Sequence, residues 1–318
     1  MLNLYKTNKI ELITDVIANE LLINPPKITE EVNIAVHNYY LGKWMRDQIT
    51  LKNEISALCE FQTITKHTEL ILKKFYSNQS FNQWDYESIK WRIISNLYEF
   101  NNFKEAEPLM KWTRDFLENN RTINKDIYIL CSKIAKIFTD YLLHRPELIY
   151  RWHHNKIDNK SLFKGLSYEE YWQPILYKLI EKNISEKPTC LYMLDFIENN
   201  FNYNNILKLL PKQFYVVAIN NLSKLQINFY IKLSKIKNIN IYLLSPGYDL
   251  WNRIYTEEGI VDFSELEFHK KDKSRSIEKV FGSFGANFEK LVEESILEYD
   301  LNFNKYFPYV DPTMSINC

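Results

Sequence analysis

Apolar positions near the N-terminus alternate between short continuous runs and helical spacing. Residues 2–5 and 33–36 are short, mostly apolar runs, which are typical of buried strands. Residues 8–22 and 41–51 carry apolar side chains at intervals of three and four, which predicts amphipathic helices. The order strand, helix, strand, helix indicates a parallel α/β sheet, because parallel strands are usually joined through a helix.

Helical spacing predominates from residue 65 to residue 200. It predicts helices over residues 86–100, 104–118, 125–143, 168–182 and 189–199. In residues 125–143 the apolar side chains fall on one stripe. His144-Arg145-Pro146 ends that helix, because the residue before a proline disfavours α geometry.

Strands return after the helical block. FYVVAI at 214–219 and INIYLL at 239–244 are continuous apolar runs, as expected of strands buried on both faces. A helix over residues 222–234 separates them, and another is predicted over residues 282–299.

The predicted fold class is α/β, with two regions. Residues 1–64 and 201–318 are expected to form a parallel-sheet domain, and residues 65–200 a large all-helical insertion. This layout resembles one motor domain of a superfamily 1 helicase.

Composition narrows the chemistry. The 318 residues include 40 basic and 40 acidic side chains, so any affinity for nucleic acid must come from a local patch. Only six glycines are present, which almost excludes glycine-rich loops that bind phosphates. The four cysteines are widely spaced and form no CxxC pair. We therefore expect no metal, no cofactor and no disulfide framework. The N-terminus lacks a signal-peptide pattern and no apolar run reaches membrane-spanning length, which predicts a cytoplasmic protein.

A phosphate-binding loop would need two glycines, a lysine and a hydroxyl residue directly after a strand. After the strand at 33–36, Gly42-Lys43 occupies the place of the Gly-Lys pair. His37 replaces the first glycine, and Trp44 replaces the hydroxyl that would hold magnesium. The pair is interpreted either as a degenerate nucleotide site or as a chance dipeptide, and neither interpretation allows ATP hydrolysis.

In a motor ATPase another buried strand ends in two acidic residues, one that holds magnesium and one that activates the attacking water. Here the run ending at Ile219 is followed by Asn220-Asn221, whose neutral amides bind magnesium poorly and cannot accept the proton. The alternative is an ordinary asparagine-rich turn.

Three blocks of the chain resemble the family of RecC, the gamma subunit of bacterial exodeoxyribonuclease V. The first, F-x-x-Y-L-x-x-R-P followed by W, is carried by Phe138, Tyr141-Leu142, Arg145-Pro146 and Trp152. The second is Trp172-Gln173 and the residues after it, where Tyr177 replaces an aromatic of the family. The third runs from the strand at 214–219 to Trp251, where Leu250 replaces a tyrosine. Trp44 also matches a family tryptophan, which favours packing for it, and Tyr40 replaces a glycine there.

The resemblance implies a motor fold that has lost ATPase function, within an ATP-dependent helicase and nuclease. Such a subunit would act in double-strand-break repair and homologous recombination. It would guide unwound DNA strands, read the Chi signal, and assemble with RecB-like and RecD-like subunits. Because the family's chains are much longer, we expect this chain to be a fragment or a truncated product. The alternatives are an active helicase fragment and a purely structural docking module.

Four residues are candidates for DNA contact. The resemblance places the region after the second strand and the Arg-Pro turn near the 3′ strand, where this chain has His37, Tyr39, Lys43 and Arg145. Only Arg145 matches the family in residue type, which leaves Chi reading open. Arginine pairs with phosphate or a guanine edge, and tyrosine stacks on bases. The alternatives are a C-terminal helix cap that interacts with the helix dipole for Arg145, and core packing for Tyr39.

Other aromatic and histidine residues favour structural roles. Trp91, Trp152 and Trp172 are predicted to be core residues rather than DNA stackers. His153-His154 lacks nearby cysteines and is predicted to be a solvated helix end rather than a metal site.

Overall fold

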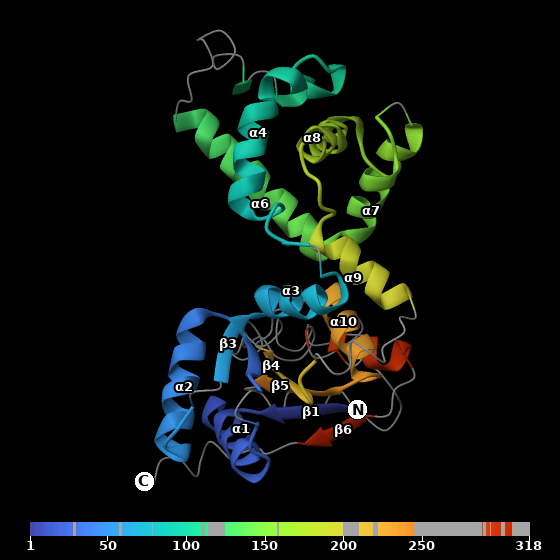
Figure 1. Cartoon of the computed structure of the whole chain (residues 1–318). Helices are drawn as coiled ribbons and strands as arrows, with labels where there is room; N and C mark the ends of the chain where they lie inside the picture. The colour runs from blue at the N-terminus through green and yellow to red at the C-terminus, as the bar shows by residue number, and fades with distance from the viewer. Residues whose placement is uncertain are drawn as a thin grey trace, which may run out of the picture. The chain divides into compact units, whose positions relative to one another are not determined.

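The chain forms two compact units, one of residues 1–74 and 202–318 (unit 1) and one of residues 75–201 (unit 2). The computed structural model describes residues 1–27, 30–56, 59–77, 79–109, 112–113, 125–157, 159–199, 210–218, 222–244, 288, 291–292, 294–299 and 303–306. Figure 1 shows both units along the chain.

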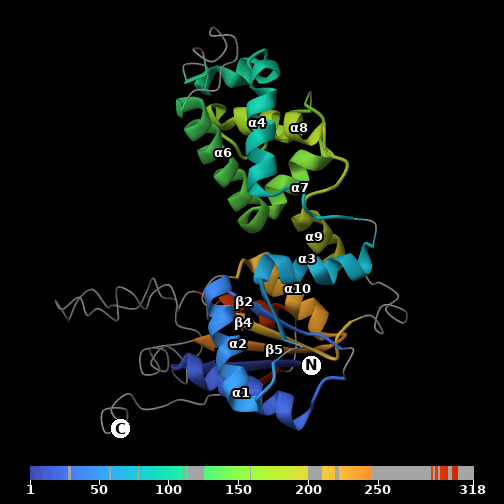
Figure 2. The ribbon, with the colours of Figure 1, turned by 60° about the vertical axis from the view of Figure 1, so that its left-hand side comes forward.

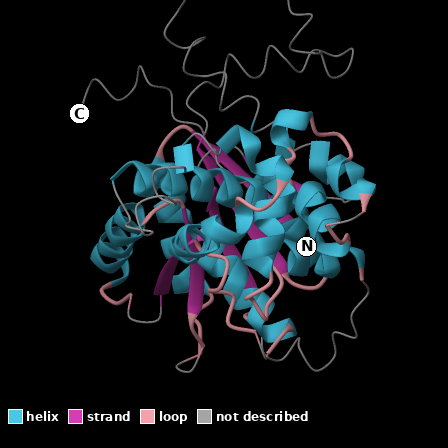
Figure 3. Ribbon diagram, turned by 90° about the horizontal axis from the view of Figure 1, so that it is seen from above, coloured by secondary structure: helices cyan, strands magenta, loops and turns pink. Residues whose placement is uncertain are grey.

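Unit 1 is built on a six-stranded sheet with the order β3-β2-β4-β5-β1-β6. Every pairing between the described strands is parallel, so the predicted parallel α/β class is confirmed. The strands, drawn in magenta in Figure 3, are β1 (Leu2–Thr7), β2 (Val32–Val36), β3 (Cys59–Thr63), β4 (Gln213–Ala218), β5 (Asn238–Leu244) and β6 (Phe303–Tyr306).

Helices cover both faces of this sheet (Figures 1 and 2). On one face α1 (Ile10–Ile23) and α2 (Tyr39–Asn53) enclose a core that includes Ile17, Ile34 and Tyr215. On the other face lie α3 (Ile64–Phe75) and α10 (Lys224–Ser234). Burial on both faces explains why β4 and β5 are continuous apolar runs.

The two edge strands are absent from the sequence prediction. β3 reads Cys-Glu-Phe-Gln-Thr, and only Cys59 of the five is buried. Such a strand has no apolar run to detect, because an edge strand is stabilised by its pairing with β2 and by α2 packing over it. β6 pairs with β1 at the opposite edge.

Unit 2 is helical in its described residues. Its α-helices are α4 (Tyr86–Phe100), α6 (Lys125–His144), α7 (Pro146–His154), α8 (Trp172–Glu181) and α9 (Thr189–Glu198). Three short 3-10 helices accompany them: η1 (Lys104–Ala106), η2 (Lys160–Phe163) and η3 (Tyr168–Glu170). The helix predicted over residues 104–118 begins at η1, and residues 110–111 and 114–118 lie outside the described residues.

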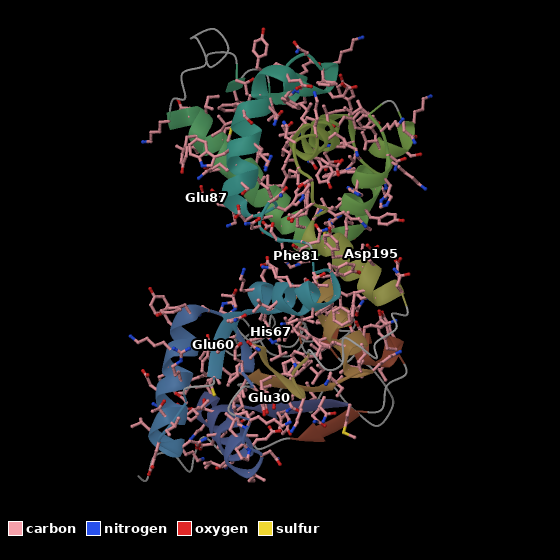
Figure 4. All side chains as sticks on the ribbon, viewed as in Figure 1. Glu30, Glu60, His67, Phe81, Glu87 and Asp195 are labelled. Atoms are coloured by element: carbon pink, nitrogen blue, oxygen red, sulfur yellow. The ribbon has the colours of Figure 1, made fainter. Side chains whose placement is uncertain are left out.

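The insertion was expected to begin at residue 65, immediately after β3. Apart from Phe75, α3 instead belongs to unit 1. His67 of α3, labelled in Figure 4, explains this, because its ring lies 5.8 Å from the ring of Phe214 in β4.

Candidate nucleic-acid interface

The connection between β2 and α2 is short. It consists of His37 and Asn38, since β2 ends at Val36 and α2 begins at Tyr39. The Asn38 side chain caps the helix by accepting the N–H of Leu41 at 2.9 Å. The N–H of Gly42 donates to the Asn38 carbonyl at 3.2 Å, as an ordinary helical bond. Gly42 and Lys43 therefore lie inside the helix, whereas a phosphate loop presents free backbone N–H groups ahead of it.

Gly42 has a packing reason to be glycine. A Cβ at this position would lie 2.8 Å from Cβ of Phe61 and 3.3 Å from Cγ2 of Val36. Helix α2 therefore approaches β2 and β3 more closely than any larger residue would allow. Trp44 is partly buried and packs against the core of the same face.

Replacing Gly42 with alanine is expected to lower the free energy of unfolding of unit 1 by roughly 1–2 kcal/mol. Overpacking costs about 1–3 kcal/mol, and the 2.8 Å approach to Phe61 places this site in the upper part of that range, at about 2–3 kcal/mol. The better helix propensity of alanine returns about 1 kcal/mol. Urea unfolding measures the difference, with Lys43→Ala as the control, because Lys43 is exposed on the same helix. Equal stability of Gly42→Ala and the unaltered chain would contradict a packing role.

The start of α2 presents two tyrosines to solvent. Tyr39 is 73% exposed and Tyr40 is 80% exposed, and their rings meet edge to face at 5.9 Å. Core packing, the structural alternative for Tyr39, is therefore wrong. His37 and Lys43 are also exposed, so the structure brings together three of the four candidate DNA-contact residues. Tyr40 was missed as a candidate, although a tyrosine pair directly after a helix cap is a visible signal.

These residues lie at the carboxyl-terminal ends of the parallel strands of the sheet. After β2 the chain enters α2 on one face, whereas after the neighbouring β4 it enters α10 on the other face. Open α/β sheets bind ligands where adjacent strands diverge in this way. Asn220-Asn221, the other part of the predicted degenerate nucleotide site, lie outside the described residues.

Arg145, the fourth candidate, belongs to unit 2. It joins α6 to α7 and is exposed, with its backbone N–H donating to the Tyr141 carbonyl at 2.9 Å. Burial and the Glu170 charge raise the pKa of Tyr141, while a hydrogen bond with Gln173 and the Arg145 charge act against that rise. In the described structure Arg145 occupies the N-cap position of α7 without a side-chain cap bond.

The histidine pair at the end of α7 is divided between two roles. His153 is partly buried and its Nδ1 is hydrogen-bonded to the Glu181 carboxylate of α8, so the solvated reading is wrong for this residue. Burial favours a raised pKa for Glu181, but hydrogen bonds from His153 and Lys178 lower it below its ordinary value. His154 is exposed and bonds the Tyr150 carbonyl of its own helix.

The described residues contain no group of three or more His, Cys, Asp or Glu side chains arranged to hold a metal ion. Among them, no helix combines the length and apolar character needed to cross a membrane.

Comparison with known proteins identifies the family. Residues 2–308 match the family model described as RecC, N-terminal domain. Because the match covers nearly the whole chain, the chain belongs to this family, and the sequence-based resemblance is confirmed.

Relatives from three bacteria, each named RecBCD enzyme subunit RecC, agree with this assignment. The relative from Buchnera aphidicola subsp. Baizongia pistaciae is 26% identical over 262 residues, which cover 78% of this chain and 22% of the relative. The relative from Haemophilus influenzae is 20% identical over 301 residues, which cover 87% of this chain and 26% of the relative. The relative from Escherichia coli K12 is 22% identical over 188 residues, which cover 57% of this chain and 15% of the relative. This chain therefore spans about a quarter or less of their length.

Proposed function

We propose that the chain supplies a non-catalytic DNA-binding surface to a RecBCD-type helicase and nuclease that acts in DNA repair and recombination. The observation that carries the proposal is the exposed group at the start of α2: His37, Tyr39, Tyr40 and Lys43. The family and the names of the relatives support the subunit role. In this proposal the domain is a motor fold without nucleotide chemistry, and its partners are RecB-like and RecD-like subunits.

The chemistry of the group suits unpaired nucleic acid. Each tyrosine offers a π face on which a base stacks, for about 1–3 kcal/mol per base. Lys43 adds a positive charge on the same helix, and the positive end of the α2 dipole favours a phosphate nearby. Arg145 supplies a separate phosphate or guanine contact in unit 2. Guiding of the strands and reading of Chi belong to this proposal.

The β2–α2 turn argues against the alternative of an active helicase fragment. With only His37 and Asn38 between strand and helix, and a satisfied N–H at Gly42, the backbone has no cradle for phosphates at this strand. We therefore expect the full chain to turn over no ATP with or without DNA. DNA-dependent ATP hydrolysis by the purified chain would establish the alternative.

Replacing Tyr39 and Tyr40 together with alanine is expected to weaken single-stranded DNA binding by about 10- to 100-fold, since at least one stacked base is lost. Fluorescence anisotropy with labelled oligonucleotides measures this in the complex assembled with the RecB-like and RecD-like subunits. The matched control is the double change to phenylalanine, which keeps the rings. Lys43→Ala and Arg145→Ala should each reduce the slope of log K against log salt by about 0.7 for single strands. Unchanged affinity in all these variants would leave the purely structural role as the explanation.

A further inference from the structure

At the opposite, amino-terminal ends of the strands there is a cavity of about 420 Å³. It lies where α1 ends and where β2, β4 and β5 begin, entirely within unit 1. Leu21, Val32 and Tyr215 are buried side chains at its wall. Pro25, Pro26 and Pro211 also line it. Because proline fixes its own φ angle, this part of the wall is held in shape before anything binds.

The lining of the cavity also includes an exposed apolar side chain and two acidic ones. Ile23 lines it and is 76% exposed, and the adjacent Leu22 is exposed as well. Glu30, labelled in Figure 4, and Glu31 place two carboxylates at the cavity against the single ammonium of Lys212. Glu30 is fixed there because its Oε1 accepts the backbone N–H of Lys212 at 3.4 Å.

We propose that this cavity docks another subunit of the same enzyme, which inserts a long apolar side chain beside a lysine or arginine. The apolar wall takes the side chain, and the excess of carboxylates takes the neighbouring cation. The exposed Leu22 and Ile23 extend the apolar surface past the cavity, which calls for a partner with a surface of its own rather than a small molecule. The excess of one negative charge in the lining disfavours a phosphate backbone as the occupant.

The inference rests on the proposed subunit role, since it takes the partner from the complex that the relatives' names describe. It assigns different partners to the two ends of the strands. The carboxyl-terminal ends carry exposed tyrosines and a lysine for DNA, and the amino-terminal ends carry an apolar, acidic cavity for a protein.

The test uses the full chain with the RecB-like and RecD-like subunits of the same source. Ile23→Gln should weaken assembly about tenfold, because an exposed apolar contact is lost while the fold is unaffected. Glu31→Lys should weaken assembly and make it less sensitive to salt. Leu51→Gln is the matched control, since Leu51 is 79% exposed on α2 and does not line the cavity. Circular dichroism checks that each variant is folded.

The outcomes separate the two proposals. Assembly that is unaffected by Ile23→Gln and Glu31→Lys overturns the docking site and leaves the subunit role intact. Failure of the unaltered chain to assemble overturns both. Equal weakening by Leu51→Gln shows a general surface effect and overturns the assignment to the cavity. A homodimer that Ile23→Gln dissociates identifies a second copy of the chain as the occupant, against the proposal.

Discussion

Replacing Trp152 with alanine is expected to lower the free energy of unfolding of unit 2 by about 3–5 kcal/mol, the usual cost of removing a fully buried tryptophan. Trp152 is 0% exposed. Its ring lies 5.6 Å from the ring of Tyr177, 5.9 Å from that of Tyr141 and 6.3 Å from that of Phe138. The cavity left by alanine cannot close easily, because these neighbours lie on two other helices, α6 and α8, that pack against α7.

Trp91→Ala is the matched control for this experiment. Trp91 is 50% exposed on α4, so its replacement should cost less than about 1 kcal/mol. Urea unfolding followed by hydrogen exchange on peptides of unit 2 measures both variants. Similar losses for Trp91 and Trp152 would show that the aromatic cluster around Trp152 does not hold the unit together.

The two tryptophans also show what helical spacing predicts and what it misses. The bounds of α4 agree with the predicted helix over residues 86–100. All three tryptophans were nevertheless predicted to be core, on residue type. Ile89, Ile93 and Leu97 form the buried stripe of α4, and Trp91 lies off that stripe, so the prediction was wrong for Trp91. It was right for Trp152, and Trp172 is partly buried.

The candidate site was predicted in part for a similar reason. The position of the site after β2 follows from local sequence, because a strand and a capped helix are adjacent there. The role of Gly42 does not follow from local sequence. It depends on contact with Phe61, which lies in a strand that the apolar pattern does not reveal. The exposure of Tyr39 depends on how α2 lies on the sheet, which spacing alone cannot fix. Long-range contacts therefore determine both the packing role of Gly42 and the exposure of Tyr39.

His67 is another residue of unit 1 whose properties depend on long-range contacts, because these contacts determine its protonation state. The side chain is 1% exposed, and its Nδ1 lies 2.9 Å from the Tyr230 hydroxyl of α10. Burial lowers the pKa of His67 to about 4, although a hydrogen bond with the Asn33 backbone acts in the opposite direction. The imidazole is therefore neutral in the folded protein at neutral pH.

Acidification is expected to destabilise unit 1 between pH 6.5 and pH 4 because of this residue. In the unfolded chain the His67 pKa is about 6.5, so below that pH the unfolded state binds a proton that the folded state excludes. The contribution is complete above pH 6.5 and falls as the pH drops, by about 2 kcal/mol from pH 7 to pH 5 and about 3 kcal/mol in total. Urea unfolding at pH 7, 6 and 5, with hydrogen exchange on β4 and β5, measures this loss.

Two variants separate His67 from the other groups that titrate in the same range. His67→Gln should remove most of the loss between pH 7 and pH 5, although it lowers stability at pH 7, because the hydrogen bond to Tyr230 is altered. His154→Gln should retain the full pH dependence, because His154 is exposed. A pH dependence that survives His67→Gln would mean that another group is responsible. The predicted result would instead show that a neutral histidine between α3 and the sheet ties α3 to unit 1.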